Sequence, residues 1–130
     1  MSENTDDIEE IRARKRAELA ATVGTPEDPV HVDGNAHLDE LVSDHRVVLV
    51  DFYADWCGPC KVLEPTVETI AAETAATVAK VDIDAHQQLA AGHGVQGVPT
   101  LLLFVDGEPT EQLVGVQQES ELRSLVEAHA

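Results

Sequence analysis

The sequence is poor in basic residues and in aromatic side chains. Its 130 residues include 8 Lys and Arg against 25 Asp and Glu, giving a formal net charge of −17, and Phe, Trp and Tyr together number four. Binding of nucleic acid through a basic face is not expected, because phosphate contacts need clustered Lys and Arg. The same shortage argues against attraction to an anionic membrane surface.

Long hydrophobic runs are also missing. In the later part of the chain the longest apolar stretch is 101–105, whereas a membrane-spanning helix needs ~20 apolar residues. The first ten residues are acidic, and no apolar segment typical of a secretory signal peptide follows them. We therefore expect no membrane partner and a cytoplasmic location.

Small and β-branched apolar side chains are abundant, with 16 Ala and 17 Val. The apolar fraction of 43% is enough for one modest core in a single domain. Only three lysines accompany the acidic excess, a combination typical of halophilic proteins, in which concentrated salt screens self-repulsion. A halophilic protein is one hypothesis, and a surface charge that serves solubility alone is the other.

Composition divides the chain near residue 27. Half of the basic residues lie within 12–16, after an acidic stretch, and this order of charges suits the dipole of a helix. We predict a helical N-terminal extension over 1–27 and a globular domain over 28–130. Two hypotheses for the extension stay open: a marginal helix, or a helix that docks on the domain or on a partner.

Regular apolar patterns begin near residue 30. Strands are predicted at 30–32, 46–54, 77–83, 100–105 and 112–114. Helices are predicted around 38–42, from the cysteines to about 74, around 86–91, and at 119–129. This order predicts an α/β fold in which parallel strand pairs come first and an antiparallel hairpin, turning at Asp106 and Gly107, comes last. The expected result is a central mixed β-sheet flanked by helices on both faces.

The only two cysteines are Cys57 and Cys60, which enclose Gly58 and Pro59. Cys57 follows a predicted buried strand and begins a helix, whose free N–H groups and dipole stabilise a thiolate. A thiolate is the form that attacks a disulfide, and Cys60 lies one helical turn away, close enough to resolve the mixed disulfide. The spacing therefore favours thiol–disulfide exchange.

A metal centre is the main competing interpretation of the cysteines. Structural zinc usually takes four ligands, but the chain has no second cysteine pair, and its six histidines show no ligand-like spacing. Haem attachment needs His directly after the second cysteine, where this chain has Lys61. We therefore expect no metal and no bound cofactor.

The surroundings of the cysteines resemble a known family. The segment Val50–Lys61 closely resembles the active-site segment of thioredoxins. Three further motifs match in order and spacing: Val81–Asp84, Gly97–Thr100 and Phe104–Gly107. The resemblance covers about 29–130 and implies the thioredoxin fold, together with reduction of protein disulfides by dithiol–disulfide exchange.

The resemblance also implies catalytic roles at matching positions. Cys57 would be the exposed nucleophile and Cys60 the buried resolving thiol, and the two would form the redox disulfide. Asp51 would lie behind the cysteines and help to deprotonate Cys60, and Lys80 would approach Asp51 from the neighbouring strand. Because Asp51 stands within an apolar run, its pKa should be raised by burial.

Several residues would form the substrate-binding surface: Trp56, Gly58, Pro59, Val98, Pro99 and Gly115. Pro99 matches the family's cis-proline, which exposes the Val98 backbone to a pairing substrate strand. Trp56 would cap the active-site surface, and Gly115 would border the substrate groove. The Gly-Pro pair between the cysteines favours a reductant, because related oxidases and isomerases usually carry a histidine there that stabilises the reduced thiolate.

Our leading interpretation is a monomeric, cytoplasmic electron carrier that reduces disulfide-containing client proteins. A separate thioredoxin reductase would recharge it, since nothing in the sequence is typical of nicotinamide or flavin binding. A thiol oxidase or isomerase on the same fold is one alternative, and a non-catalytic binding module that uses the fold as a scaffold is another. The chain departs from the family at Tyr53, where Trp is frequent, and at His93, where many members have an aromatic residue.

Overall fold

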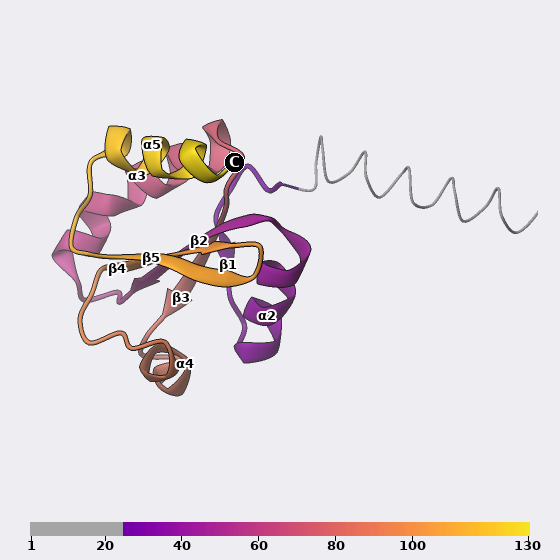
Figure 1. Cartoon of the computed structure of the whole chain (residues 1–130). Helices are drawn as coiled ribbons and strands as arrows, with labels where there is room; N and C mark the ends of the chain where they lie inside the picture. Colours follow the sequence, from indigo (N-terminus) through magenta and orange to yellow (C-terminus); the bar gives the residue numbers. More distant parts are fainter. Residues whose placement is uncertain (1–24) are drawn as a thin grey trace, which may run out of the picture.

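A five-stranded sheet with two helices on each face makes up residues 25–130, the part of the chain that the computed structural model describes (Figure 1). The predicted N-terminal helix lies outside these residues. The elements are β1 (Val30–His31), α2 (Asn35–Asp44), β2 (Val47–Tyr53), α3 (Gly58–Glu73), β3 (Thr77–Asp82), α4 (Gln87–Gly92), β4 (Thr100–Val105), β5 (Glu108–Val114) and α5 (Glu119–His129).

The sheet is mixed, as the element order predicts. Its strands lie in the order β1-β3-β2-β4-β5, and β3 pairs in parallel with both β1 and β2 because helices connect these strands. β4 runs antiparallel to β2, and β5 runs antiparallel to β4. Asp106 and Gly107 join β4 to β5 with φ values of 53° and 85°, the left-handed backbone that a two-residue hairpin turn requires.

Strand β2 lies at the centre of the sheet and contributes to two separate cores. Val47 and Leu49 pack with α3 and α5, which cover one face. Val48, Val50 and Phe52 pack with α2 and α4 on the opposite face. Alternation along the strand therefore decides which helices each side chain contacts. Figure 1 shows α3 and α5 on one side of the sheet and α2 and α4 on the other.

Two features of the elements bear on the sequence-based expectations. β5 begins at Glu108, whereas the prediction placed its start at residue 112. The prediction missed the first residues of the strand because they are exposed and lack the alternation that marks a half-buried strand. No helix within residues 25–130 has both the length and the apolar character needed to cross a membrane.

Candidate active site

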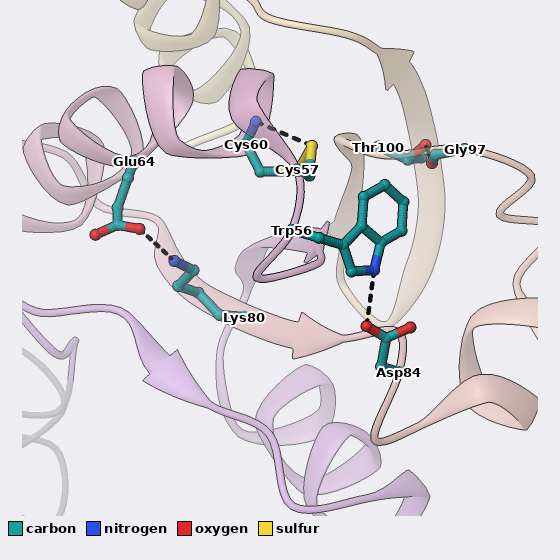
Figure 2. The surroundings of a disulfide bond; sticks show 8 residues. All are labelled: Trp56, Cys57, Cys60, Glu64, Lys80, Asp84, Gly97 and Thr100. Atoms are coloured by element: carbon teal, nitrogen blue, oxygen red, sulfur yellow. Dashed lines mark hydrogen bonds and ion pairs between the residues drawn. A yellow bond between two sulfur atoms is a disulfide. The ribbon is translucent and has the colours of Figure 1, made fainter.

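The two cysteines lie at the amino end of α3, directly after β2 and its connecting loop. Cys57 is the N-cap residue of the helix, and it forms a disulfide with Cys60 across a Cα–Cα distance of 5.3 Å. The Cys60 N–H donates a hydrogen bond to Cys57 Sγ at 3.1 Å (Figure 2). One of the free N–H groups of the first helical turn thus points at the sulfur of Cys57.

This geometry favours a negative charge on Cys57 when the disulfide is reduced. A free N–H donor and the positive end of the helix dipole both stabilise a thiolate more than a thiol. A thiolate at the end of a helix, with a second thiol one turn along, can form a mixed disulfide and then exchange it for an internal one. The arrangement is suited to thiol–disulfide exchange.

The exposure expected for Cys57 is wrong for the disulfide-bonded protein. Cys57 is 4% exposed and Cys60 is 5% exposed, so burial does not distinguish the two. The pair packs with Ala54, and the half-buried side chains of Ile83 and Val98 cover the same cluster. The sequence motif gives the spacing of the cysteines, but the residues that bury them lie in loops that are distant in sequence.

Asp51 is a buried carboxyl in the middle of β2. It is 1% exposed, and its Oδ1 atom has no hydrogen-bond partner in the part of the chain that the structure describes. Burial raises the pKa of Asp51 from 3.8 to about 6; the Lys80 ammonium opposes this rise, and the Glu64 carboxylate adds to it. A carboxyl with this pKa can gain and lose a proton near neutral pH.

Lys80 is the residue of β3 that stands beside Asp51 in the sheet register. Its side chain is buried, and its Nζ lies 3.6 Å from Glu64 Oε2 (Figure 2). The same Nζ lies 4.4 Å from the centre of the Tyr53 ring. Sequence reasoning missed Glu64. The available signal was its spacing of four residues from Cys60, which places both side chains on one face of α3.

Trp56 lies on the surface beside the disulfide. Its side chain is 70% exposed, and its Nε1–H donates a hydrogen bond to Asp84 Oδ2 at 2.9 Å (Figure 2). The Asp84 contact fixes the direction of the indole and was also missed from the sequence. A shallow groove of about 340 Å³ runs beside the ring, lined among others by Trp56, Ile83, Gln87, Val95 and Val98.

The loop before β4 borders the disulfide from another side. The Val98–Pro99 peptide bond is cis, as the resemblance implies, and Val98 packs against the cysteine cluster. The Gly115 N–H donates to the Pro99 carbonyl at 2.8 Å, and Gly115 has φ +92°, a conformation that glycine adopts without strain. Thr100 Oγ1 donates to the Gly97 carbonyl at 2.7 Å (Figure 2).

The structure thus places the predicted site residues in two layers. The surface layer consists of the covered disulfide of Cys57 and Cys60 and the residues around it, which are Trp56, Gly58, Pro59, Val98, Pro99 and Gly115. The inner layer consists of Asp51 and Lys80, which lie side by side in the sheet. Among residues 25–130, no three His, Cys, Asp or Glu side chains are grouped so that they could hold a metal ion.

A family model and two curated relatives of this chain all point to the same protein family. The Thioredoxin family model matches residues 29–128. Thioredoxin of Mycobacterium tuberculosis (strain H37Rv) is 45% identical over 85 residues, covering 64% of this chain and 73% of that protein. Thioredoxin of Mycoplasmoides gallisepticum is 37% identical over 97 residues, covering 74% of this chain and 97% of that protein.

Solved structures agree with these relatives. A single-site mutant of thioredoxin from Halobacterium salinarum NRC-1 is 55% identical, with a TM-score of 0.79, and the match covers 81% of this chain and 93% of that one. The thioredoxin of Fasciola hepatica is 34% identical, with a TM-score of 0.72, covering 78% and 99% of the two chains.

Proposed function

We propose roles for the residues of this site on the premise that the chain belongs to the thioredoxin family. The chain is accordingly a thiol–disulfide oxidoreductase that reduces protein disulfides. The observation that carries the assignment of roles is the hydrogen bond from the Cys60 N–H to Cys57 Sγ. It makes Cys57 the sulfur that a helix terminus stabilises as a thiolate, and hence the nucleophile.

The proposed reaction begins with the reduced pair. The Cys57 thiolate attacks one sulfur of a client disulfide, so a Cys57–client bond forms, the client disulfide breaks, and one client sulfur leaves as a thiolate. Cys60 then loses its proton to the Asp51 carboxylate, and its thiolate attacks Cys57 Sγ. The second client thiolate is released, two electrons have passed to the client, and the protein is left with the Cys57–Cys60 disulfide.

We propose that the client lies across the surface layer as an extended segment. Among residues 25–130, no backbone-to-backbone hydrogen bond of a turn, loop or cap involves Val98, so its backbone polar groups are available to a pairing strand. Pro59 and Trp56 are exposed beside it, and Gly58 and Gly115 leave room for a close backbone approach. These residues are the proposed substrate-binding surface.

We also propose the partners and organisation that the family suggests. The partners are disulfide-containing client proteins and a separate thioredoxin reductase that returns two electrons to the disulfide. The chain acts as a monomer in the cytoplasm, with residues 1–27 as a helical extension of the domain at 28–130. The absence of a histidine between the cysteines supports reduction over the oxidase or isomerase alternative.

Reduction of insulin by dithiothreitol in concentrated KCl tests the proposed roles. We expect the protein to accelerate the precipitation of insulin and Cys57→Ser to abolish the acceleration. Cys60→Ser should instead accumulate a mixed disulfide, because it attacks but cannot resolve. Equal activity of the Cys57→Ser variant would overturn the assignment of the nucleophile, and a strongly oxidising potential of the pair would favour the oxidase alternative.

Alkylation by iodoacetamide separates the reductase from the binding-module alternative. A scaffold needs no activated thiol, whereas a nucleophilic Cys57 should react at a lower pH than an ordinary thiol does. Labelling of the reduced protein across pH measures this directly. Ordinary thiol behaviour of Cys57 would contradict the proposed role of the helix terminus.

We propose in addition that the protein is adapted to concentrated salt. The net charge of −17 and the likeness to a Halobacterium salinarum structure support this. Salt at multimolar concentration shortens the Debye length to roughly 3 Å and so relieves repulsion among the carboxylates. The melting temperature should rise from dilute buffer to concentrated KCl, and equal melting temperatures would overturn the proposal.

A further inference from the structure

Two further titratable side chains, Glu64 and Tyr53, contact the inner layer of Asp51 and Lys80, so three elements contribute to this group. Asp51 and Tyr53 belong to β2, Lys80 to β3 and Glu64 to α3. Lys80 is the one cation that an ion pair or a ring contact ties to this group within residues 25–130. Its position therefore decides which of the nearby carboxyl groups is neutralised.

The Lys80 ammonium is held by Glu64 and Tyr53. It lies 3.6 Å from Glu64 Oε2 and 4.4 Å from the centre of the Tyr53 ring. Although Asp51 and Lys80 are register partners, no ion pair within 4.0 Å joins them in the described part of the chain. Within residues 25–130, Asp51 Oδ1 also has no hydrogen-bond partner.

We propose that Glu64 is a positioning residue for proton transfer from Cys60, because it holds the Lys80 ammonium off Asp51 and so keeps Asp51 a stronger proton acceptor. This inference rests on the proposed role of Asp51 in the resolving step. The transfer itself moves one proton from Cys60 Sγ to the Asp51 carboxylate. Glu64 neither gains nor loses a proton in it.

The charges around Asp51 act in opposite directions. Burial raises its pKa, the Lys80 ammonium lowers it and the Glu64 carboxylate raises it, to about 6. An ammonium released from Glu64 could approach the unpartnered Oδ1 and lower the pKa of Asp51 further. Glu64 therefore acts on Asp51 twice, once through its own charge and once by retaining Lys80.

The remaining charged groups at this end of the sheet act on Tyr53. Burial raises the pKa of the Tyr53 hydroxyl, and the carboxylates of Asp82, Asp55, Asp51 and Glu64 raise it further. The phenol thus stays neutral while Asp51 titrates. Its ring supplies a face for the Lys80 ammonium and no competing charge.

The placement of Glu64 suits a function better than a contribution to stability. Its side chain is 51% exposed, whereas that of Lys80 is 8% exposed, and ion pairs with an exposed member stabilise folded proteins little. Glu64 also follows Cys60 by four residues, so the two side chains share one face of α3. The residue that holds the lysine is therefore attached to the helix that carries the thiol.

The test follows the Asp51 carboxyl by NMR titration in the oxidised full-length protein. In Glu64→Gln its pKa should fall by roughly one unit, the effect of bringing an opposite charge closer and removing a like one. Glu68→Gln is the matched control, because it removes the same charge from an exposed residue one turn further along α3. An unchanged Asp51 titration in Glu64→Gln, or an equal fall in the control, would overturn the proposal.

A double-mutant cycle shows whether Glu64 acts through Lys80. In a Lys80→Met background, Glu64→Gln should shift the Asp51 titration by less than half as much as it does in the parent. A shift of undiminished size would overturn the positioning role, because it would show a direct action of Glu64 on Asp51. Lys80→Met alone should raise the pKa of Asp51.

Kinetics of the resolving step distinguish the proposed role of Glu64 from the proposed role of Asp51, on which it rests. The acidic limb of its pH profile should move down in Glu64→Gln, by the same amount as the Asp51 titration, and stay in place in Glu68→Gln. An unmoved limb would overturn the link to Cys60. Unchanged resolution in Asp51→Asn would overturn the role of Asp51, whereas the NMR titration decides independently whether Glu64 holds Lys80.

Discussion

The two faces of the sheet are built from the same strands but differ in their buried charge. Within residues 25–130, the buried side chains of the α2 and α4 face are apolar apart from two hydroxyl groups, with Val48, Val50 and Phe52 at the centre. The α3 and α5 face also has an apolar core cluster, which includes Leu49 and Leu63. The same face contains both buried charged residues of the described chain, Asp51 and Lys80. The two buried charges give this face little stability, because apolar residues of similar volume are often as stable or more stable in such a position.

Matched cavities on the two faces provide the strongest test of this comparison. Leu38→Ala on the α2 side and Leu63→Ala on the α3 side each remove a fully buried side chain and should each lower the free energy of unfolding by about 2–5 kcal/mol. Only Leu63→Ala should alter insulin reduction per folded molecule, since Leu63 adjoins Glu64 on α3. Urea unfolding and activity assays below the transition measure both effects, and a loss of activity in Leu38→Ala would contradict the division.

Asp51→Asn should raise stability in a pH-dependent manner. Burial raises the folded-state pKa of Asp51 from 3.8 to about 6, so its contribution is fully favourable below pH 3.8 and is lost as the pH rises through 6. The loss is about 3 kcal/mol at ~1.4 kcal/mol per pKa unit. The variant should gain up to about that amount at pH 8 and less than about 1 kcal/mol at pH 4, and it should resolve mixed disulfides more slowly.

Urea unfolding at the two pH values checks the stability of Asp51→Asn. The amide that replaces the carboxyl still lacks a partner for one of its atoms, which reduces the gain. An equal effect at pH 4 and pH 8 would show that the charge of Asp51 is not what destabilises this face.

Thr77→Val concerns the one buried hydroxyl of the apolar face that has no partner within residues 25–130. Thr77 Oγ1 is fully buried and makes no hydrogen bond to any residue of the described part of the chain. Replacing it by a methyl group of similar shape should stabilise the protein by about 1 kcal/mol, because an unsatisfied polar group is removed. Thermal melting measures the gain, and insulin reduction should not change. Destabilisation by Val would show that the hydroxyl is satisfied by solvent.

Arg123→Gln should have the smallest effect. Arg123 bridges Glu73 of α3 and Glu119 of α5 at 2.7 Å and 2.9 Å on the outside of the α3 and α5 face. The bridge is exposed to solvent, so its loss should lower the melting temperature slightly in dilute buffer and less in concentrated KCl. A large loss at high salt would place an important part of the helix packing in this network.

Most of the fold could be predicted because the signals are local. Apolar runs in the sequence predict the strands β2 and β4, and the Asp106–Gly107 pair predicts the hairpin turn. The apolar periodicity also predicts the observed bounds of α5. The mixed sheet follows from the order of these elements. β5 was too short in the prediction because its first residues are exposed and carry no alternation.

The site was predictable where chemistry is encoded in spacing and unpredictable where it depends on tertiary contacts. The cysteine pair lies at the start of α3 as predicted. Glu64, by contrast, cannot be distinguished in the sequence from the other acidic residues of a helix surface. Its contact with Lys80 is visible only in the structure, because the two residues belong to α3 and β3. The burial of Cys57 escaped prediction for the same reason, since Ile83 and Val98 reach it from other loops.

The single tryptophan of the chain can serve as an intrinsic fluorescence probe of the disulfide. Trp56 is the only fluorophore of its kind in the chain and precedes the disulfide directly in the sequence, with its indole fixed by Asp84. Opening or closing the bridge changes the surroundings of this fixed indole (Figure 2), so its emission should differ between the reduced and the oxidised protein. Each electron exchange can thus be timed in solution without attaching a dye.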